Sequence, residues 1–168
     1  MYTISIIIDD VIDALKAAIQ PFVGSTQIVR GQSNRTPMPN NPCVVLTELL
    51  SVDLSVPRTE YQNIAETATV TGPTRIDIQV DFYDGLSGEY CKLIQMMFRT
   101  GIGFDSFPAT IKPLYCSDGV QSPLITGEQQ WESRWTLTAS LQYNPVVTLP
   151  QQSADSLNMH FTNQADKL

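Results

Sequence analysis

The chain has 168 residues, of which 42% are hydrophobic, and this composition fits one domain with a sizeable core. Its 17 acidic and 10 basic side chains give a net charge of −7, which argues against a protein that grips nucleic acid through the phosphates. No apolar run approaches the ~18–20 residues that span a bilayer, and the start, Met1-Tyr2-Thr3, has no basic region, so we expect neither a membrane span nor a signal peptide and predict a product that stays in the cytosol.

Residues 5–22 are predicted to form the first helix, because their apolar side chains recur at helical spacing. Ser5 is the candidate N-cap, and Pro21 and Gly24 are expected to end the helix. The apolar stripe consists of Ile8, Val11, Ile12, Leu15, Ile19 and Phe22.

A run of strands is expected next. Residues 26–30 are a short strand candidate, and 31–42 read as a loop because they are rich in proline and asparagine. Residues 43–56 return to strand, and 58–66 are polar and turn-like. Residues 65–71 form another predicted strand, bent or broken at Gly72-Pro73. In the 43–56 strand one face is predicted to be apolar, interrupted only by Glu48, and it comprises Val44, Leu46, Leu50, Val52, Leu54 and Val56.

The stretch 74–103 is predicted to run from a strand directly into a second helix. Arg75, Asp77, Gln79 and Asp81 alternate with apolar residues, which is the period of a half-buried strand. Beyond Asp84-Gly85 the spacing becomes helical, with Ser87 as the candidate N-cap and Gly101 as the stop. The predicted helical stripe, which should lie across the sheet, is Leu86, Tyr90, Leu93, Ile94, Met97 and Phe98.

The last third is predicted to hold two strands and a polar tail. Residues 110–116 form a short strand, 117–128 a loop, and 129–143 a second clean alternation that ends at Asn144-Pro145. One face of that strand is predicted to hold Trp131, Trp135, Leu137, Ala139, Leu141 and Tyr143.

The order helix, strands, helix, strands predicts an α+β fold with a mostly antiparallel β-sheet and two helices packed on one face. We expect residues 1–149 to form one domain and 150–168 to form a C-terminal arm that a partner orders. Its candidate anchors are Leu157, Met159 and Phe161. Because strands over 43–56 and 129–143 would span about 45–50 Å at ~3.3 Å per residue, they should bend at bulges or protrude toward a neighbouring subunit.

No pattern commits the chain to catalysis, a cofactor or a metal. The only histidine, His160, lies in the polar tail, and no phosphate-binding glycine motif is present. Asp77 and Asp81 would lie about 13 Å apart at ~3.3 Å per residue, too far to share one ion, and Asp84 adds no compact set. The cysteines, Cys43, Cys91 and Cys116, are odd in number and widely spaced, so we interpret them as buried thiols.

The element order and three local stretches resemble the tail terminator, or neck terminator, proteins of contractile and long-tailed bacteriophages. The resemblance covers roughly residues 5–150. The stretches that carry it are Pro42-Cys43-Val44-Val45-Leu46, Arg75-Ile76-Asp77-Ile78-Gln79-Val80-Asp81-Phe82-Tyr83 and Gln130-Trp131-Glu132-Ser133-Arg134-Trp135.

The resemblance implies a structural virion protein and no enzyme. A homo-hexameric ring would cap the finished tail tube, stop its growth, and present its other face to head-completion proteins of the neck. The tail tube protein, neck proteins and possibly the sheath protein would be its partners. It would act in the virion after assembly in the host cytoplasm. The alternatives are a head-completion or connector-adaptor subunit, and a small-ligand module or enzyme using Trp131 and Trp135.

The implied ring gives four residues a candidate role. Arg75, Asp77, Asp81 and Arg134 are predicted to face either the channel or a subunit interface. DNA would pass through the channel without specific binding, and we expect the excess acid on the channel wall, with contributions from the 58–66 or 117–128 loops. An acidic wall would repel the duplex and keep it sliding.

Overall fold

Strand β6 (Thr74–Tyr83), the strand that the alternation from Arg75 predicts, lies at the centre of the main sheet. The computed structural model describes residues 3–32, 39–62, 65–83, 85–122, 124–125 and 131–151. Strand β6 pairs antiparallel with β3 (Cys43–Asp53) on one side and with β11 (Arg134–Tyr143) on the other. The sheet order is β2-β3-β6-β11-β7, where β2 (Gln27–Arg30) runs parallel to β3, and β8 (Val120–Gln121) also pairs with β11, beyond β7 (Ile111–Cys116).

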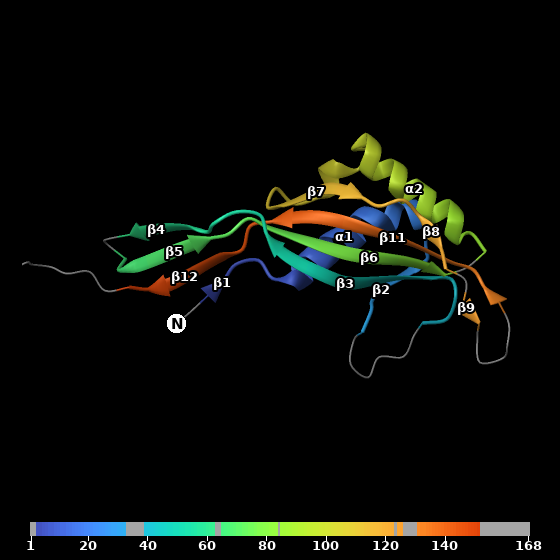
Figure 1. Cartoon of the computed structure of the whole chain (residues 1–168), viewed down its shortest axis with the longest axis horizontal. Coiled ribbons are helices and arrows are strands. Elements are labelled where there is room, and N and C mark those ends of the chain that lie inside the picture. The colour runs from blue at the N-terminus through green and yellow to red at the C-terminus, as the bar shows by residue number, and fades with distance from the viewer. Residues whose placement is uncertain are drawn as a thin grey trace, which may run out of the picture.

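Both helices cover the same face of this sheet, and the core lies between them and it (Figure 1). Helix α1 (Ile8–Val23) and helix α2 (Ser87–Thr100) each send a buried stripe onto the strands. A short 3-10 helix, Phe104–Ser106, follows α2. The predicted α+β fold with two helices on one face of a mostly antiparallel sheet is therefore confirmed. Completely buried side chains of the core include Leu15, Ile19, Ile76, Ile78, Val80, Ile94 and Leu141.

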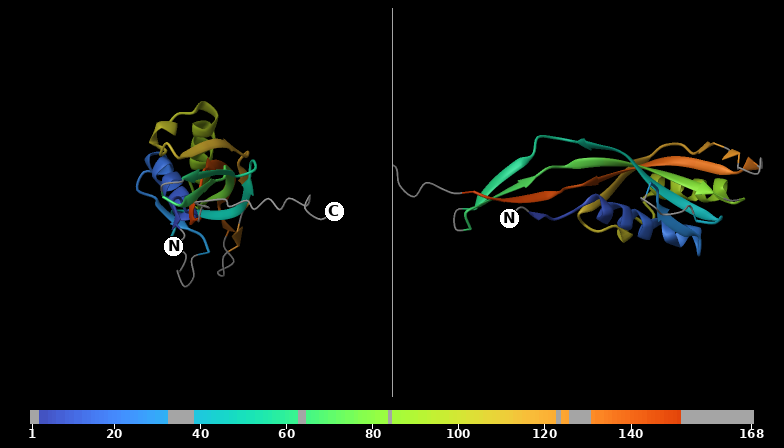
Figure 2. Two further views of the ribbon diagram at one scale, coloured as in Figure 1. Left: turned by 90° about the vertical axis from the view of Figure 1, so that its left-hand side faces the viewer. Right: turned by 90° about the horizontal axis from the view of Figure 1, so that it is seen from below.

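A second sheet projects from the body, and neither α1 nor α2 packs on it (Figure 2). Its strand order is β1-β12-β5-β4. We call it the projecting sheet, and its strands are β1 (Thr3–Ile4), β4 (Arg58–Gln62), β5 (Thr67–Thr71) and β12 (Val146–Pro150). The two sheets are joined by continuous chain, because β3 leads to β4, β5 to β6 and β11 to β12. A proline lies in each connection, Pro57, Pro73 and Pro145, and a residue without an N–H interrupts a strand ladder there.

The projecting sheet corrects the prediction that residues 58–66 are turn-like. Residues 58–62 form β4, paired antiparallel with β5. Every residue of β4 is exposed, so the sequence carries no hydrophobic alternation to reveal it. The predicted break at Gly72-Pro73 is confirmed as the step between β5 and β6.

Strand β3 also differs from its prediction. It ends at Asp53, and its register shifts between Glu48 and Leu50, which is a β-bulge. The bulge places Leu50 opposite Asp77 and Val52 opposite Arg75, on the helix-free face, where they are 49% and 38% exposed. The prediction that 43–56 presents one continuous apolar face is therefore wrong beyond Leu46.

Two predicted helix caps are wrong as well. Helix α1 starts after Ile7, whose N–H donates to the Asp10 carboxylate at 2.9 Å, while Ser5 Oγ accepts from Val146 N at 3.3 Å. Ser87 is already helical, and its hydroxyl bonds Ser133 Oγ at 2.8 Å. The predicted stop at Gly101 is confirmed, because this residue has φ 72° and donates to Met97 O.

Pro21 lies inside α1, which continues to Val23 with Gly24 as its C-cap. On α2, Leu93 is exposed rather than part of the buried stripe, and Cys91 takes a buried position instead. No helix within the described ranges is long and apolar enough to cross a bilayer.

A small strand pair, β9 (Leu124–Ile125) and β10 (Trp131–Glu132), lies within the region predicted as a loop and the start of the last strand. The chain breaks from strand geometry at Ser133, between β10 and β11. The C-terminal arm anchors Leu157, Met159 and Phe161, together with Asp84 and His160, lie outside the described residues.

Candidate assembly surfaces

The four predicted site residues Arg75, Asp77, Asp81 and Arg134 lie together on the helix-free face of the main sheet. Strand β6 supplies the first three, and β11 places Arg134 beside them. The structure thus brings them into two ion pairs within one chain. Their assignment to a channel or a subunit interface stays a prediction.

Asp81 is the centre of the first pair. Its Oδ1 accepts from Arg134 Nε at 3.1 Å, Arg134 Nη2 at 3.0 Å and Thr136 Oγ1 at 2.5 Å, and its Oδ2 accepts from Gln79 at 2.7 Å. The side chain of Asp81 is only 3% exposed and that of Arg134 is 23% exposed. These four donors replace the water that the Asp81 carboxylate loses on burial. The charged carboxylate can therefore be buried on this face of the sheet.

The guanidinium of Arg134 also lies over the ring of Tyr83, 5.7 Å from its centroid, which is a cation–π arrangement. Burial raises the pKa of the Tyr83 phenol, and the Asp81 carboxylate raises it further, while Arg134 opposes the change. Tyr83 is therefore a neutral side chain at physiological pH.

Asp77 is the centre of the second pair, one pleat along β6. Ser140 donates to its Oδ1 at 2.6 Å, and Arg75 Nη2 donates to its Oδ2 at 3.3 Å. Arg75 in turn donates to the hydroxyl of Tyr115 at 3.2 Å, which ties β7 to the centre of the sheet. Each of the two β6 carboxylates, Asp77 and Asp81, thus has an arginine partner within its own chain.

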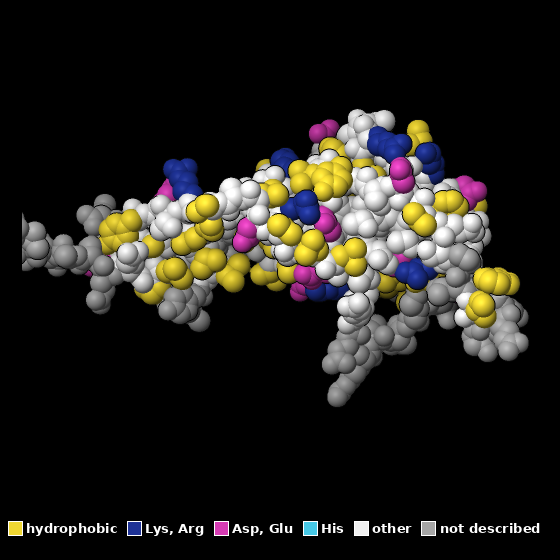
Figure 3. Space-filling model, in the orientation of Figure 1, with side chains coloured by type: hydrophobic (Ala, Val, Ile, Leu, Met, Phe, Trp, Pro, Cys, Tyr) yellow, Lys and Arg dark blue, Asp and Glu magenta, His cyan; other side chains and the backbone are white. Residues whose placement is uncertain are grey.

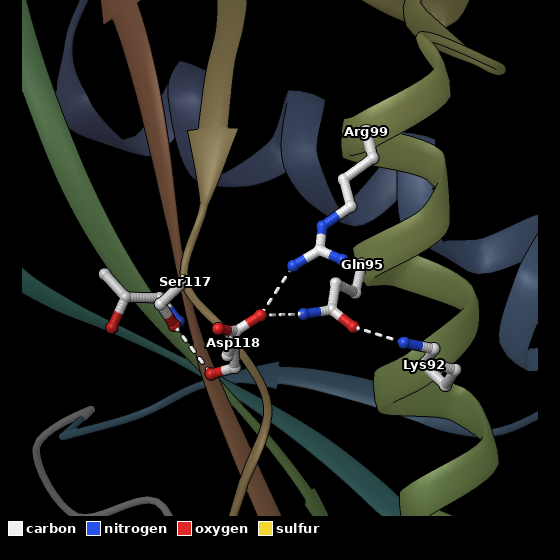
Figure 4. Close-up of polar contacts among 6 residues, drawn as sticks. Lys92, Gln95, Arg99, Ser117 and Asp118 are labelled. Carbon is white, nitrogen blue, oxygen red and sulfur yellow. Dashed lines mark hydrogen bonds and ion pairs between the residues drawn. The ribbon is translucent and has the colours of Figure 1, made fainter.

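A groove of about 730 Å³ lies between α2 and the segment that follows β7. Asp118 forms one wall, where its Oδ1 accepts from Gln95 and from Arg99, each at 2.6 Å (Figure 4). Lys92 donates to Gln95 Oε1 at 2.9 Å, so three α2 side chains converge on this wall. The contacts fasten the segment to α2 across an open surface.

The floor of the groove is built by small residues. A Cβ at Gly88 would lie 3.2 Å from Trp135 Nε1, and a Cβ at Gly119 would lie 2.5 Å from Cys91 Sγ. Burial raises the pKa of the Cys91 thiol to about 11, with a further contribution from Cys116, so the thiol is protonated at neutral pH. A protonated, buried thiol is a poor nucleophile.

The tryptophan face expected of a small-ligand module is not formed. Trp131 lies on β10 and is 72% exposed, whereas Trp135 is half-buried against the core. Trp131 belongs to the β9–β10 pair and Trp135 to the main sheet, so the continuous strand predicted for 129–143 is interrupted at Ser133 between the two tryptophans. Among the described residues, no group of three or more His, Cys, Asp or Glu side chains could hold a metal ion.

The projecting sheet is the surface that sequence reasoning described least. Exposed hydrophobic side chains run along it with few charges among them (Figure 3). The alternation of Ala68 and Val70 with threonines, and of Val147 and Leu149 after Pro145, is the sequence signal that could have located its apolar face.

A single-layer sheet of this kind is a feature of proteins that assemble, since an uncovered apolar face gains from a partner. The comparison with known families agrees with that reading. The family model of phage neck terminator proteins matches residues 9–165. The chain belongs to this family. A comparison with curated proteins found no match.

Membership makes the chain a structural protein of the bacteriophage neck, as the sequence resemblance predicted. It implies a location in the tail or neck of the virion and association with other tail and neck proteins.

Proposed function

We propose that this neck terminator protein forms a homo-hexameric ring that caps the finished tail tube and joins it to the head-completion proteins. The observation that carries the proposal is the family match over residues 9–165, which spans the body and three of the four strands of the projecting sheet, β4, β5 and β12. The elongated subunit supports it, because a sheet that leaves the body can reach a neighbour around a ring (Figure 2).

The ring face that ends the tube would do so by occupying the site where the next tube subunit would add. No bond is made or broken in this role, so it needs only a complementary surface. We further propose that the sheath protein contacts the same ring where the tail is contractile, and that the ring assembles in the host cytoplasm.

The test is assembly of purified tail tube protein with and without this protein, followed by electron microscopy of tube lengths and tube ends. We expect tubes to stop growing when the protein is added, and each end to carry six copies of the 18.6 kDa chain, about 112 kDa. Twelve copies at the tube end would favour the connector-adaptor alternative. Tubes that grow past the added protein would contradict the proposal.

A further inference from the structure

The projecting sheet has one apolar face and one polar face. Strand register places Tyr61, Ala68 and Leu149 side by side, and it places Val70, Val147 and Ile4 in the next row. Thr59 is the one polar residue in these rows, and no charged residue is among them. The opposite face is mostly polar, with Val146 and Pro150 as its apolar residues, and its charged residues are Arg58 and Glu60. Such alternation is typical of a sheet whose apolar face is covered.

That apolar face is the continuation of the helix-bearing face of the main sheet. Counting every second residue back from buried Ile76 leads through Thr74 and Gly72 to Val70 and Ala68. A hollow of about 450 Å³, lined in part by Ile4, Ile7, Tyr143 and Pro145, marks the point where helical cover ends. In the body α1 and α2 form the second layer, and neither of these helices extends over the projecting sheet (Figure 2).

Among the described residues no second layer covers this face, and several of its large apolar side chains are partly or largely exposed. Ile4 is 59% exposed and Tyr61 is 42% exposed, and Val70, Val147 and Leu149 are half-buried in a sheet one layer thick. A small sheet gains its stability from packing a second layer on its apolar face. Because the face carries no charge, covering it costs no desolvation of an ion.

The chain also has a helix with an unused apolar stripe. On α2, Leu93 is 43% exposed and Met96 is 51% exposed, one turn apart and pointing away from the core side chains Ile94 and Met97. Helix α2 and the projecting sheet lie at opposite ends of the molecule, so the two surfaces cannot meet within one chain (Figure 1).

We propose that the apolar face of the projecting sheet is the seat of a second copy of this chain, whose α2 supplies the missing layer through Leu93 and Met96. The contact is head-to-tail, which is the kind that closes into a ring when its rotation allows. The proposal rests on the proposed ring and specifies its subunit contact. The charged flanks of α2, Glu89, Lys92 and Arg99, would then lie at the rim of the contact.

The first experiment places a charge on either face of the same strand. Val147→Lys puts an ammonium on the apolar face of β12, and Thr148→Lys puts the same group on the polar face as a matched control. Circular dichroism and tryptophan fluorescence establish that each variant is folded. Mass photometry of the protein bound to tube ends should show a loss of rings of tenfold or more for Val147→Lys and little change for Thr148→Lys. Folded Val147→Lys protein that assembles as well as wild type would overturn the proposal.

The second experiment does not depend on the stability of a charged variant. A photoreactive benzoylphenylalanine at position 147 of the full chain should crosslink to the α2 peptide of another copy on tube ends, as mass spectrometry identifies. Crosslinks to a different neck protein, or to another part of a second copy, would overturn the proposed pairing. Rings that show the α2 crosslink but fail to stop tube growth would overturn the proposed function and leave the contact standing.

Discussion

Asp81 is 2% exposed although it lies on the sheet face that neither α1 nor α2 covers. We predict that Asp81→Asn lowers the free energy of unfolding by about 2–3 kcal/mol, because it leaves the largely enclosed guanidinium of Arg134 without its counter-charge. Denaturant unfolding followed by tryptophan fluorescence measures the change. The exposed pair Arg58–Glu60 is the control, and Glu60→Gln should change stability by less than about 0.5 kcal/mol. If Asp81→Asn and Glu60→Gln lowered the free energy of unfolding equally, burial would not explain the importance of the Asp81–Arg134 pair.

Gly119 is a second residue with a specific steric role. We predict that Gly119→Ala destabilises the fold by about 1–3 kcal/mol, because the new Cβ would lie 2.5 Å from the buried Cys91 Sγ. Adding Cys91→Ala to that variant should recover part of the loss, and a double-mutant cycle measures the coupling. Gly85→Ala is the control, since nothing lies within 4 Å of a Cβ there. Additive effects of the two substitutions would show that the thiol is not the obstacle.

Strand β12 is the last strand that the structure describes. It ends at Pro150, and Gln151 N then donates to Glu66 O at 2.8 Å. Truncation after Gln151 keeps every described contact, so we expect the stability of the fold to change by less than about 0.5 kcal/mol and ring formation to weaken. Thermal unfolding measures the stability of the truncated chain, and the size of the particles on tube ends measures ring formation.

The anchors proposed for the C-terminal arm give the control for that truncation. Full-length protein with Leu157, Met159 and Phe161 replaced by serine should lose assembly to the same degree as the truncated chain. If the truncated chain instead fails to fold, the arm belongs to the core and the predicted division at 149/150 is wrong.

Elements with a buried alternating face were predictable from the sequence. Strands β6, β7 and β11 and both helices lie close to their predicted positions, because apolar periodicity reports burial directly. Strand β4 was missed because all its residues are exposed, and the bulge in β3 was missed because register depends on a partner strand. Strand β4 and the bulge both depend on how one strand pairs with another, and the sequence of a single segment does not encode that pairing.

The candidate site was predictable in part. Alternation placed Arg75, Asp77 and Asp81 on one face correctly, since period two fixes it. The pairing of Asp81 with Arg134 depends on the register of β6 against β11, in which Arg134 lies opposite Tyr83. The expected tryptophan face failed because one irregular residue, Ser133, ends the alternation.

At the scale of the whole molecule, the net charge of −7 per chain would give a hexamer a formal charge of 6 × −7, or −42. Duplex DNA carries about one negative charge per 1.7 Å of its axis. The sign of the net charge on the wall of the proposed channel would therefore decide whether DNA slides past it or binds to it. We predict a net negative lumen. The described acids Asp77, Asp81 and Asp118 have arginine partners, whereas α1 exposes Asp10 and Asp13.

A charge map of the assembled ring tests this prediction, together with duplex binding at low salt. We expect no retention of DNA, and a lumen where carboxylates outnumber cations. A neutral or basic lumen, with the acids spread over the outer rim, would leave the net charge as a matter of solubility alone.

The pairing of β1 with β12 joins Thr3 to Thr148 and Ile4 to Val147, which are almost the whole chain apart. During synthesis β1 leaves the ribosome long before β12 exists, so it stays without this partner strand while the residues between the two strands are made. A chain released early, before β12, has no strand to place between β1 and β5. The projecting sheet is therefore completed only once β12 has been made, and a product that terminates before β12 lacks part of the apolar face that we propose binds a second copy, so on that proposal it would be kept out of a growing particle.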